Sequence, residues 1–242
     1  MHRESLPRLY PIVDASFFAG SAEIVAFAKE LAAGGCSLLQ YRNKSGNARM
    51  MLEHARELRR VFVRGANPQF WPNPPKVGYA IPQDQNLHFS QNQKEVGHPF
   101  SVRLFMNDRA DLCLAAEFDG VHVGQDDLSP QAVRAIIGPD RWLGLSTHNP
   151  EQLREADLTS GDYLAIGPVF ATTSKEKPDP VVGLEGVRRA RALTRKPLVA
   201  IGGITRANAA SVIEAGADSV AVISDLLQEP QKSAEEFFRI LG

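Results

Sequence analysis

The stretch "GGCSLLQYRNKSG", Gly34–Gly46, joins a helix stop, a buried strand and a charged loop. Its glycines follow an alanine-rich segment, and glycine ends helices readily because it tolerates positive φ. The apolar setting of Ser37–Leu39 is typical of a strand buried on both faces. Alternate residues of a strand point the same way, so Gln40, Arg42 and Lys44 extend from one side. An amide and two cations therefore converge at the end of a strand that begins in the core.

The same local design, a small or acidic helix end followed by a short apolar strand, recurs along the chain. It begins with "AAGGCSLLQ" and returns as "AEFDGVHV" (Ala116–Val123), "TSGDYLAI" (Thr159–Ile166) and "EAGADSVAV" (Glu214–Val222). Strands that alternate with helices in this way predict βα units and a parallel sheet.

Apolar runs and helical periodicity predict the elements between these repeats. Strands are expected near Leu9–Val13, Ser37–Arg42, Val102–Met106, Gly120–Val123, Trp142–Leu145, Tyr163–Ile166, Leu198–Ile201 and Ser219–Val222. Helices are expected at Ala22–Ala33, Ala48–Val63, Arg109–Glu117, Pro130–Ile137, Pro150–Ala156, Leu184–Leu193, Arg206–Glu214 and Ala234–Leu241. About eight such units predict an α/β protein with a (β/α)8 TIM barrel. A doubly wound sheet is the alternative, because alternation alone does not prove closure.

The whole chain, residues 1–242, is expected to form one barrel domain. Only Gly65–Phe100 breaks the pattern, because it is rich in Pro, Asn and Gln and has no sustained periodicity. We interpret this segment, at about 65–100, as an irregular insertion between the second helix and the third strand. Loops that lead from helix to strand lie on the face opposite a barrel's active site, where an insertion is tolerated.

Composition argues against several classes of protein. Lys+Arg 27 against Asp+Glu 28 gives no overall attraction for nucleic acid or for an anionic membrane. No apolar run is long enough for a signal sequence or a membrane span, so we expect a cytoplasmic protein. Two cysteines, Cys36 and Cys113, are too few for a disulfide framework or a zinc site and read as buried structural thiols.

Polar residues gather where the predicted strands end, which is the catalytic face of a barrel. They are Asn107, Asp108, Gln125, Asp126, Asp127, Ser146, Thr147, His148, Thr172, Thr173, Ser174 and Lys175. Asp108 could instead only cap the next helix. Asp127 is harder to explain as a cap, because Ser129 and Pro130 already supply one. His122 and His148 are expected to be structural or hydrogen-bonding residues.

These side chains suggest two anion sites. Arg42, Lys44 and Lys175 could hold phosphate oxygens while Asp108 and Asp127 hold Mg²⁺, which reverses the repulsion between carboxylates and a diphosphate. The other site is built from backbone N–H groups. They come from Gly202–Gly203, which could also serve only a tight turn, and from Ile223–Ser224, and barrels often bind phosphate after strands seven and eight.

The sequence resembles the thiamine phosphate synthase family over nearly its whole length apart from Gly65–Phe100. The resemblance is carried, in chain order, by "LLQYRNK", "MNDRADLCLA", "DGVHVGQDDL", "GLSTHN", "DYLAIGPVFATTSK", "AIGGIT" and "AGADSVAVIS". Two features depart from the family's pattern. One is the long connection that starts near Gly65, and the other is Ala171, which stands where proline is common. The resemblance implies a transferase of thiamine biosynthesis that joins hydroxymethylpyrimidine diphosphate to a (carboxy)thiazole phosphate. The reaction releases pyrophosphate, and also CO₂ where the thiazole carries the carboxylate.

The resemblance also implies a role for each candidate residue. The pyrimidine diphosphate is bound by Gln40, Tyr41, Arg42, Asn43, Lys44, Asn107, Ser146 and Lys175, of which Arg42, Lys44, Ser146 and Lys175 are catalytic. The thiazole phosphate is bound by Thr172, Thr173, Ser174, Gly203, Ile223 and Ser224. The cofactor is Mg²⁺, held by Asp108 and by Asp127 rather than Asp126. The implied mechanism is dissociative, through a pyrimidine methylene cation, and needs no nucleophilic side chain.

Two other functions remain open from the residues alone. A tautomerase-like barrel enzyme that handles only the thiazole phosphate would not need Arg42, Lys44, Asp108 or Asp127. A non-catalytic sensor of thiazole phosphate or thiamine phosphate would bind without turnover. We expect small-molecule substrates, no nucleic-acid or membrane partner, and a possible homo-oligomer.

Overall fold

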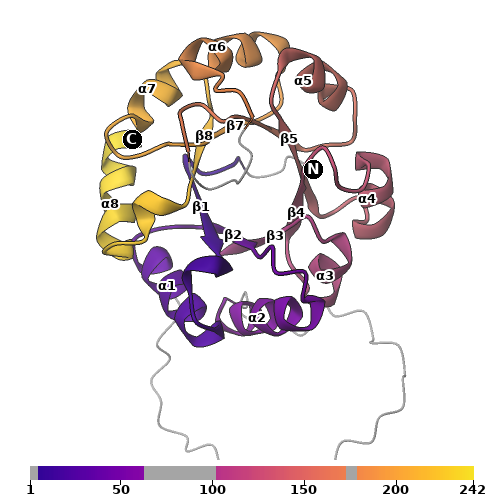
Figure 1. The fold of residues 1–242 in the computed structure, drawn as a ribbon, viewed down its shortest axis with the longest axis vertical. Helices are drawn as coiled ribbons and strands as arrows, with labels where there is room; N and C mark the ends of the chain where they lie inside the picture. Colours follow the sequence, from indigo (N-terminus) through magenta and orange to yellow (C-terminus); the bar gives the residue numbers. More distant parts are fainter. Residues whose placement is uncertain (1–4, 63–101, 173–178) are drawn as a thin grey trace, which may run out of the picture.

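The computed structural model describes residues 5–62, 102–172 and 179–242. Eight parallel strands close into a barrel in chain order, with β1 pairing to both β2 and β8 (Figure 1). The strands are β1 (Leu9–Asp14), β2 (Leu38–Arg42), β3 (Arg103–Asn107), β4 (Gly120–Val123), β5 (Trp142–Thr147), β6 (Tyr163–Ile166), β7 (Leu198–Ile201) and β8 (Ser219–Val222). The (β/α)8 prediction is confirmed, and the doubly wound alternative is wrong because the sheet closes.

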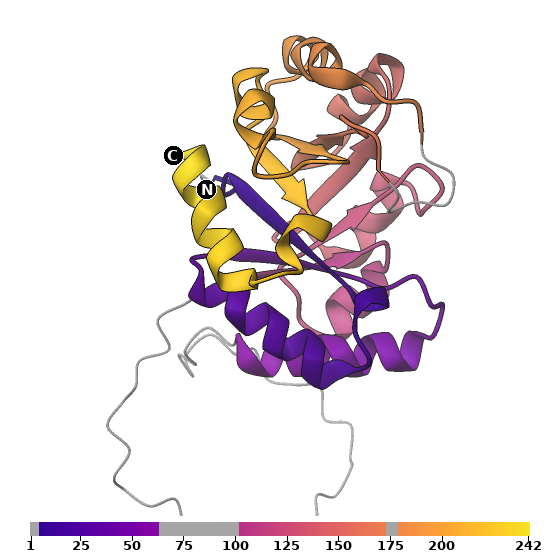
Figure 2. The same ribbon diagram turned by 60° about the vertical axis from the view of Figure 1, so that its left-hand side comes forward.

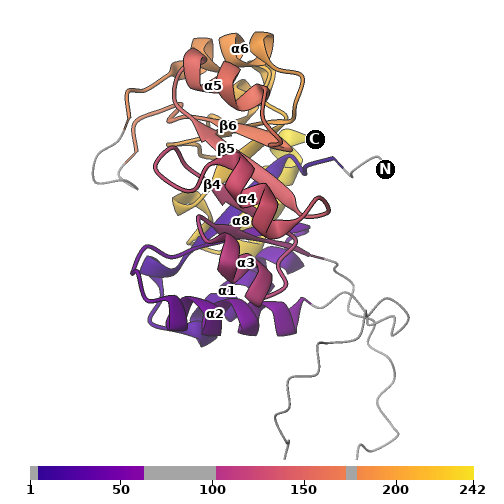
Figure 3. The same cartoon turned by 90° about the vertical axis from the view of Figure 1, so that its right-hand side faces the viewer.

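A helix follows each strand and covers the barrel from outside. The helices are α1 (Ser21–Ala33), α2 (Ala48–Val61), α3 (Ala110–Ala115), α4 (Pro130–Ile137), α5 (Pro150–Asp157), α6 (Gly183–Leu193), α7 (Ala209–Glu214) and α8 (Pro230–Leu241). Short 3-10 turns η1 (Ala15–Phe17) and η3 (Ser224–Leu226) follow β1 and β8. Figure 2 shows α8 beside β1, and Figure 3 shows α3, α4 and α5 following one another around the outside.

Strand residues alternate between two separate cores, as the side-chain period of two requires. Leu39 and Tyr41 of β2 face outward into the large core shared with the helices. Leu38 faces inward, into a smaller core that fills the barrel with Tyr10, Phe105, Trp142 and Tyr163, among others. The parity predicted for β2 is therefore confirmed, and Gln40 lies on the inner side.

Helices α3, α7 and α8 differ most from the sequence expectation, while α1 and α6 each begin one residue earlier than predicted. Helix α3 is shorter than predicted because Arg109 is its N-cap residue, with ψ of 89°, and Glu117, just after its C-cap, has φ of 56°; both lie outside the helical region. Helix α7 begins at Ala209, since the Asn208 side chain accepts a bond from Thr205 N at 2.8 Å and forms a turn before it. Helix α8 begins earlier, at Pro230, where proline suits the first helical turn.

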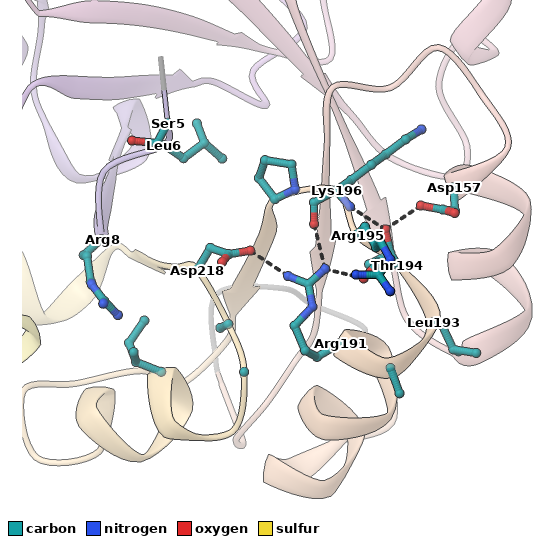
Figure 4. Close-up of a pocket in the computed structure, with 15 residues that line it drawn as sticks. Ser5, Leu6, Arg8, Asp157, Arg191, Leu193, Thr194, Arg195, Lys196 and Asp218 are labelled. Atoms are coloured by element: carbon teal, nitrogen blue, oxygen red, sulfur yellow. Dashed lines mark hydrogen bonds and ion pairs between the residues drawn. The ribbon is translucent and has the colours of Figure 1, made fainter. Parts of the chain in front are cut away.

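A hollow of about 1530 Å³ lies at the amino-terminal end of the barrel (Figure 4). It is lined by segments that precede β1, β7 and β8, including Arg8, Arg191 and Lys196. Arg191 donates to Asp218 at 2.8 Å and to the Lys196 carbonyl at 3.0 Å, so its guanidinium braces the turn between α6 and β7. This end of a barrel serves stability, and the catalytic face is the other one.

The cysteines, the proposed insertion and the search for a membrane span complete the comparison with the sequence. Cys36 and Cys113 are buried free thiols, as predicted. The proposed insertion at Gly65–Phe100 lies outside the described residues. In the described part of the chain, no helix is long and apolar enough to cross a membrane.

Candidate active site

Arg42 ends β2 at the carboxyl-terminal face, and its position is set by β1. The register pairs Arg42 with Asp14, the last residue of β1. Their side chains form an ion pair in which Asp14 is 4% exposed and Arg42 19%. The other carboxylate oxygen of Asp14 accepts from the Ser16 hydroxyl at 2.8 Å and from Ser16 N at 3.0 Å. Because both oxygens are engaged, Asp14 holds the guanidinium in one place at the mouth of the barrel.

Two of the predicted substrate-binding residues are not brought to this group. The side chain of Tyr41 lies outside the barrel against α2, where its hydroxyl is 2.9 Å from Nδ1 of His54. Asn43 donates to the same hydroxyl at 2.9 Å and accepts from Ser45 N at 2.8 Å. Burial raises the pKa of Tyr41 to about 12. These two side chains shape the loop after β2 rather than face the barrel mouth.

Lys44, Asp108 and Asp127 meet at the ends of β2, β3 and β4. Lys44 and Asp108 form an ion pair. The interpretation of Asp108 as a helix cap is wrong, because α3 has no side-chain cap and Asp108 lies before its N-cap residue. Asp127 accepts from Gly124 N at 2.7 Å, while Ser129 caps α4 as predicted. Burial first, and then the neighbouring Asp108, raise the pKa of Asp127.

This carboxylate pair has the donor set that suits a hard cation, because both groups offer only oxygen. Asp108 and Asp127 are close enough that Asp108 disfavours the charged form of Asp127. Among the described residues, no group of three or more His, Cys, Asp or Glu side chains could enclose a metal. Two carboxylates fit Mg²⁺, which commonly takes one or two from the protein and the rest of its oxygen ligands from water and substrate phosphates.

Asn107 supplies an unpaired donor in the same place. It is the last residue of β3 and is 8% exposed. Its Nδ2 is buried without a hydrogen-bond partner in the described part of the chain. A buried N–H group without a partner is costly, so a ligand oxygen or ring nitrogen is its natural acceptor.

A chain of polar side chains runs through the barrel interior beneath this face. Gln40 Nε2 donates to the Tyr10 hydroxyl at 3.0 Å, and the hydroxyls of Tyr10 and Tyr163 are 2.7 Å apart. Tyr163 lies 3.0 Å from Nδ1 of His122, whose Nε2 lies 2.8 Å from the Ser146 hydroxyl. His122 is hydrogen-bonded at both ring nitrogens within the barrel. Gln40 and Ser146 are thus connected although they lie on β2 and β5.

The loops after β6, β7 and β8 form the other side of the face. Gly202 and Gly203 have φ of 99° and 64°. A Cβ on Gly203 would lie 2.5 Å from the Ala171 carbonyl oxygen, and one on Gly202 2.5 Å from Pro168 Cβ. Gly202 and Gly203 therefore serve a tight turn, which is one of the two roles expected for them. Their close packing brings the β7 turn against the loop that leads to Thr172.

Arg206 ties the β7 loop to the turn η3. It donates to Asp225 through its backbone N at 2.8 Å and through Nε at 3.0 Å. It also reaches Glu236 of α8 at 2.5 Å. Asp225 belongs to η3, which Ser224 begins and Ile223 caps, so these contacts hold η3 against the β7 loop.

Only some of the remaining predicted residues lie in the part of the chain that the structure describes. Thr172 is partly exposed at the end of the β6 loop, whereas Thr173, Ser174 and Lys175 lie outside the described residues. His148 is a hydrogen-bonding residue as expected, with Nδ1 2.6 Å from the Gly167 carbonyl oxygen. Gln125 donates to the Ser146 carbonyl at 2.5 Å.

Sequence reasoning missed Asp14, Tyr10 and Tyr163. The signal for Asp14 is an acidic residue directly after the apolar run "YPIV", at the same level as Arg42. For the tyrosines, no local pattern separates a core phenol from a functional one. Only closure of the barrel brings their strands, β1 and β6, together.

Comparisons with known proteins show the family and the fold of the chain. The family model described as thiamine monophosphate synthase matches residues 79–226. The thiamine-phosphate synthase of Koribacter versatilis is 54% identical over 98% of this chain and 96% of its own. That of Chloroflexus aurantiacus is 37% identical over 90% and 83%. The solved thiamine phosphate pyrophosphorylase from Pyrococcus furiosus superposes with a TM-score of 0.72 at 27% identity, covering 97% of this chain and 95% of that one. The chain belongs to the thiamine monophosphate synthase family, a family of transferases.

Proposed function

We propose that this transferase makes thiamine phosphate from hydroxymethylpyrimidine diphosphate and a (carboxy)thiazole phosphate, with Mg²⁺ as its cofactor. The observation that carries the proposal is the meeting of Arg42, Lys44, Asp108 and Asp127 at the ends of adjacent strands. Cations and carboxylates side by side suit a ligand that carries both phosphate oxygens and a metal.

In this proposal the diphosphate lies over Arg42 and Lys44, with Lys175 as a third cation. Arg42, held by Asp14, offers a pre-positioned guanidinium that can donate two parallel bonds to phosphate oxygens. Lys44 is bonded to Asp108 and is 56% exposed, so it can turn toward a phosphate that enters. Asp108 and Asp127 would hold the Mg²⁺, which supplies charge neutralisation for the departing pyrophosphate.

The pyrimidine ring is assigned to the mouth of the barrel between Gln40 and Ser146. Both are polar and both belong to the inner side of the barrel. Asn107 Nδ2 lies buried on β3, one of the two strands between them. A heterocycle with ring nitrogens and an amino group can satisfy such a mixture of donors and acceptors. The barrel interior below is closed by aromatic side chains, which limits how deep the ring enters.

The thiazole phosphate is assigned to the glycine turn and η3. Backbone N–H groups of Gly203, Ile223 and Ser224 would bind its phosphate, together with Thr172, Thr173 and Ser174. The bond from Arg206 to Asp225 supports this assignment because it holds the β7 and β8 loops in a fixed relation.

The proposed mechanism is dissociative. Arg42, Lys44 and Lys175 stabilise negative charge that develops on the leaving pyrophosphate, and the C–O bond breaks before the new C–N bond is complete. The thiazole nitrogen, positioned by its bound phosphate, then attacks the pyrimidine methylene cation to form the C–N bond. Where the thiazole carries the carboxylate, its loss as CO₂ leaves thiamine phosphate. The chain contributes electrostatics and positioning, so no covalent intermediate with a side chain is needed.

The test is an assay of the protein with both precursors. We expect thiamine phosphate and pyrophosphate in the presence of Mg²⁺, and almost none after chelation by EDTA. Folded protein that yields no product with both precursors and Mg²⁺ would sink the proposal. Tight binding of thiazole phosphate without product would favour the non-catalytic sensor, and conversion of the thiazole alone would favour the tautomerase-like enzyme.

A further inference from the structure

The hydrogen-bond chain inside the barrel has a direction, which follows from the number of protons on each group. Gln40 Nε2 donates to the Tyr10 oxygen, and the Tyr163 oxygen is the acceptor that the Tyr10 proton reaches. In the reverse order Tyr163 would donate to Tyr10, and the buried Tyr10 proton would have no acceptor among the described residues, so Tyr10 donates to Tyr163. Tyr163 then accepts from Tyr10 and has its own proton for Nδ1 of His122. His122 therefore carries its proton on Nε2 and donates it to the Ser146 oxygen. All four bonds are satisfied at once in this direction.

The phenols keep the protons that this order requires. Tyr10 is 2% exposed and Tyr163 is fully buried. Burial raises the pKa of both hydroxyls far above the ordinary value, because a phenolate would lose its hydration in the barrel core. Each therefore remains a neutral group with one proton to donate.

Gly144 makes room for the central link of the chain. It lies on β5, beside both Tyr163 and His122 in the sheet. A Cβ at Gly144 would overlap the Tyr163 phenol and Nδ1 of His122. The phenol can reach the imidazole only because residue 144 has no side chain, so this glycine is required for the bond and not for a turn.

We propose that Tyr10, Tyr163 and His122 are positioning residues that set the hydrogen-bond polarity of the two ligand-facing groups, Gln40 and Ser146. The amide nitrogen of Gln40 is turned to Tyr10, which leaves its oxygen as the acceptor for a ligand. Ser146 accepts from His122, which leaves the hydroxyl proton for a ligand acceptor. The barrel mouth thus presents one acceptor and one donor in a fixed arrangement, a pattern that fits an amino group beside a ring nitrogen.

The same direction excludes a second use of His122. A histidine that activates a serine nucleophile accepts the serine proton at the nitrogen facing it. Here that nitrogen carries the proton and donates, so Ser146 is oriented and not activated. This inference rests on the proposed function for the identity of the ligand, but the polarity itself is a property of the protein alone.

The test is the tautomer of His122, read from ¹⁵N shifts of the ligand-free protein at a pH well above the ordinary imidazole pKa of about 6.5. The resonance is assigned by its loss in His122→Gln. We expect the Nε2–H form in the unmodified protein and a mixture of tautomers in Tyr163→Phe, which removes one hydroxyl and keeps the ring. Tyr41→Phe removes an equivalent bond to His54 outside the barrel and should leave the His122 signal unchanged.

Turnover provides the second readout. Tyr163→Phe should lower kcat/KM about 2- to 10-fold, the loss of one neutral hydrogen bond, through a higher KM for the pyrimidine substrate. An Nδ1–H tautomer in the unmodified protein, or an unchanged tautomer in Tyr163→Phe, would overturn the inference. If the unmodified protein makes no thiamine phosphate, the proposed function fails while the tautomer result still decides the polarity.

Discussion

Asp14 and Arg42 end adjacent strands at the same level and form an ion pair at the mouth of the barrel. Among the described residues, two cations are proposed to bind the diphosphate, and Arg42 is more buried than Lys44. Asp14 accepts hydrogen bonds at both of its carboxylate oxygens. The acid therefore belongs to the phosphate site although it would repel a phosphate on its own. Its role is to orient the guanidinium.

Asp14→Asn should weaken binding of the pyrimidine diphosphate. The amide keeps the shape of the side chain but loses the charge, and bonds to charged groups are worth about 1.5–3 kcal/mol, so we expect KM to rise about 10- to 100-fold. The measurement is steady-state kinetics with the thiazole substrate saturating. Asp162→Asn is the matched control, because Asp162 forms an ion pair with Arg134, with an N–O distance of 2.6 Å. This pair does not lie on the catalytic face. It should lower stability and leave KM unchanged; equal KM effects in both variants would contradict the orienting role.

Asp127→Asn should stabilise the metal-free protein while it abolishes the response to Mg²⁺. The carboxylate is disfavoured by burial and by Asp108, so its neutral isostere relieves that cost. Thermal unfolding in EDTA should show a higher Tm, and the assay should show turnover that no longer rises with Mg²⁺. Asp126→Asn, at the adjacent position, which is exposed as Asp127 is, should change neither. A normal Mg²⁺ response in Asp127→Asn would remove Asp127 from the metal site.

Gly203→Ala should raise KM for the thiazole phosphate. A methyl group there meets the Ala171 carbonyl oxygen at 2.5 Å, so the turn must move. Gly138→Ala provides the comparison, because Gly138 also has positive φ, 75°, but no atom within 4 Å of its added Cβ. Both variants should lose about 1–3 kcal/mol of stability from the strained backbone. Only Gly203→Ala should affect the thiazole substrate, and an equal KM increase in Gly138→Ala would count against a phosphate role for the turn.

The two thiols should make stability fall at alkaline pH. Burial raises the pKa of Cys36 and Cys113 to about 12, whereas an unfolded thiol ionises near pH 8.5. Above about 8.5 the unfolded chain releases protons that the folded chain retains, so the free energy of unfolding decreases toward pH 12. Urea unfolding at about pH 7 and about pH 10 measures the difference. A variant with both cysteines changed to alanine should show a smaller fall; an identical fall would assign it to other groups.

The sequence predicted the strands well because parallel strands buried on both faces are short apolar runs with clear ends. Strand β4 and strand β6 have the bounds expected for them. Helix starts were less predictable, since they depend on side-chain bonds in the preceding turn, as Asn208 illustrates before α7. The face that carries the candidate site also followed from the pattern, because a barrel gathers all strand ends at one edge.

The sequence pattern does not show which residues at the strand ends are in contact with one another. Asp14 meets Arg42 through the β1–β2 register, and Tyr41 turns away from Gln40 although the two are adjacent. Tyr10 and Tyr163 lie far apart in the chain, and their contact depends on closure of the sheet and on the missing side chain of Gly144. These are tertiary facts, set by register and by space rather than by local sequence.

The central claim is that Asp108 and Asp127 hold a metal ion whose remaining ligands include oxygens of the substrate diphosphate. Calorimetry of pyrimidine diphosphate binding, with and without Mg²⁺, tests it directly in the unmodified protein and in the double variant Asp108→Asn, Asp127→Asn. We predict that Mg²⁺ tightens binding at least tenfold, about 1.4 kcal/mol, in the unmodified protein and has no such effect in the variant. Equal tightening in a folded double variant would contradict the account, because the metal would then be held without these carboxylates.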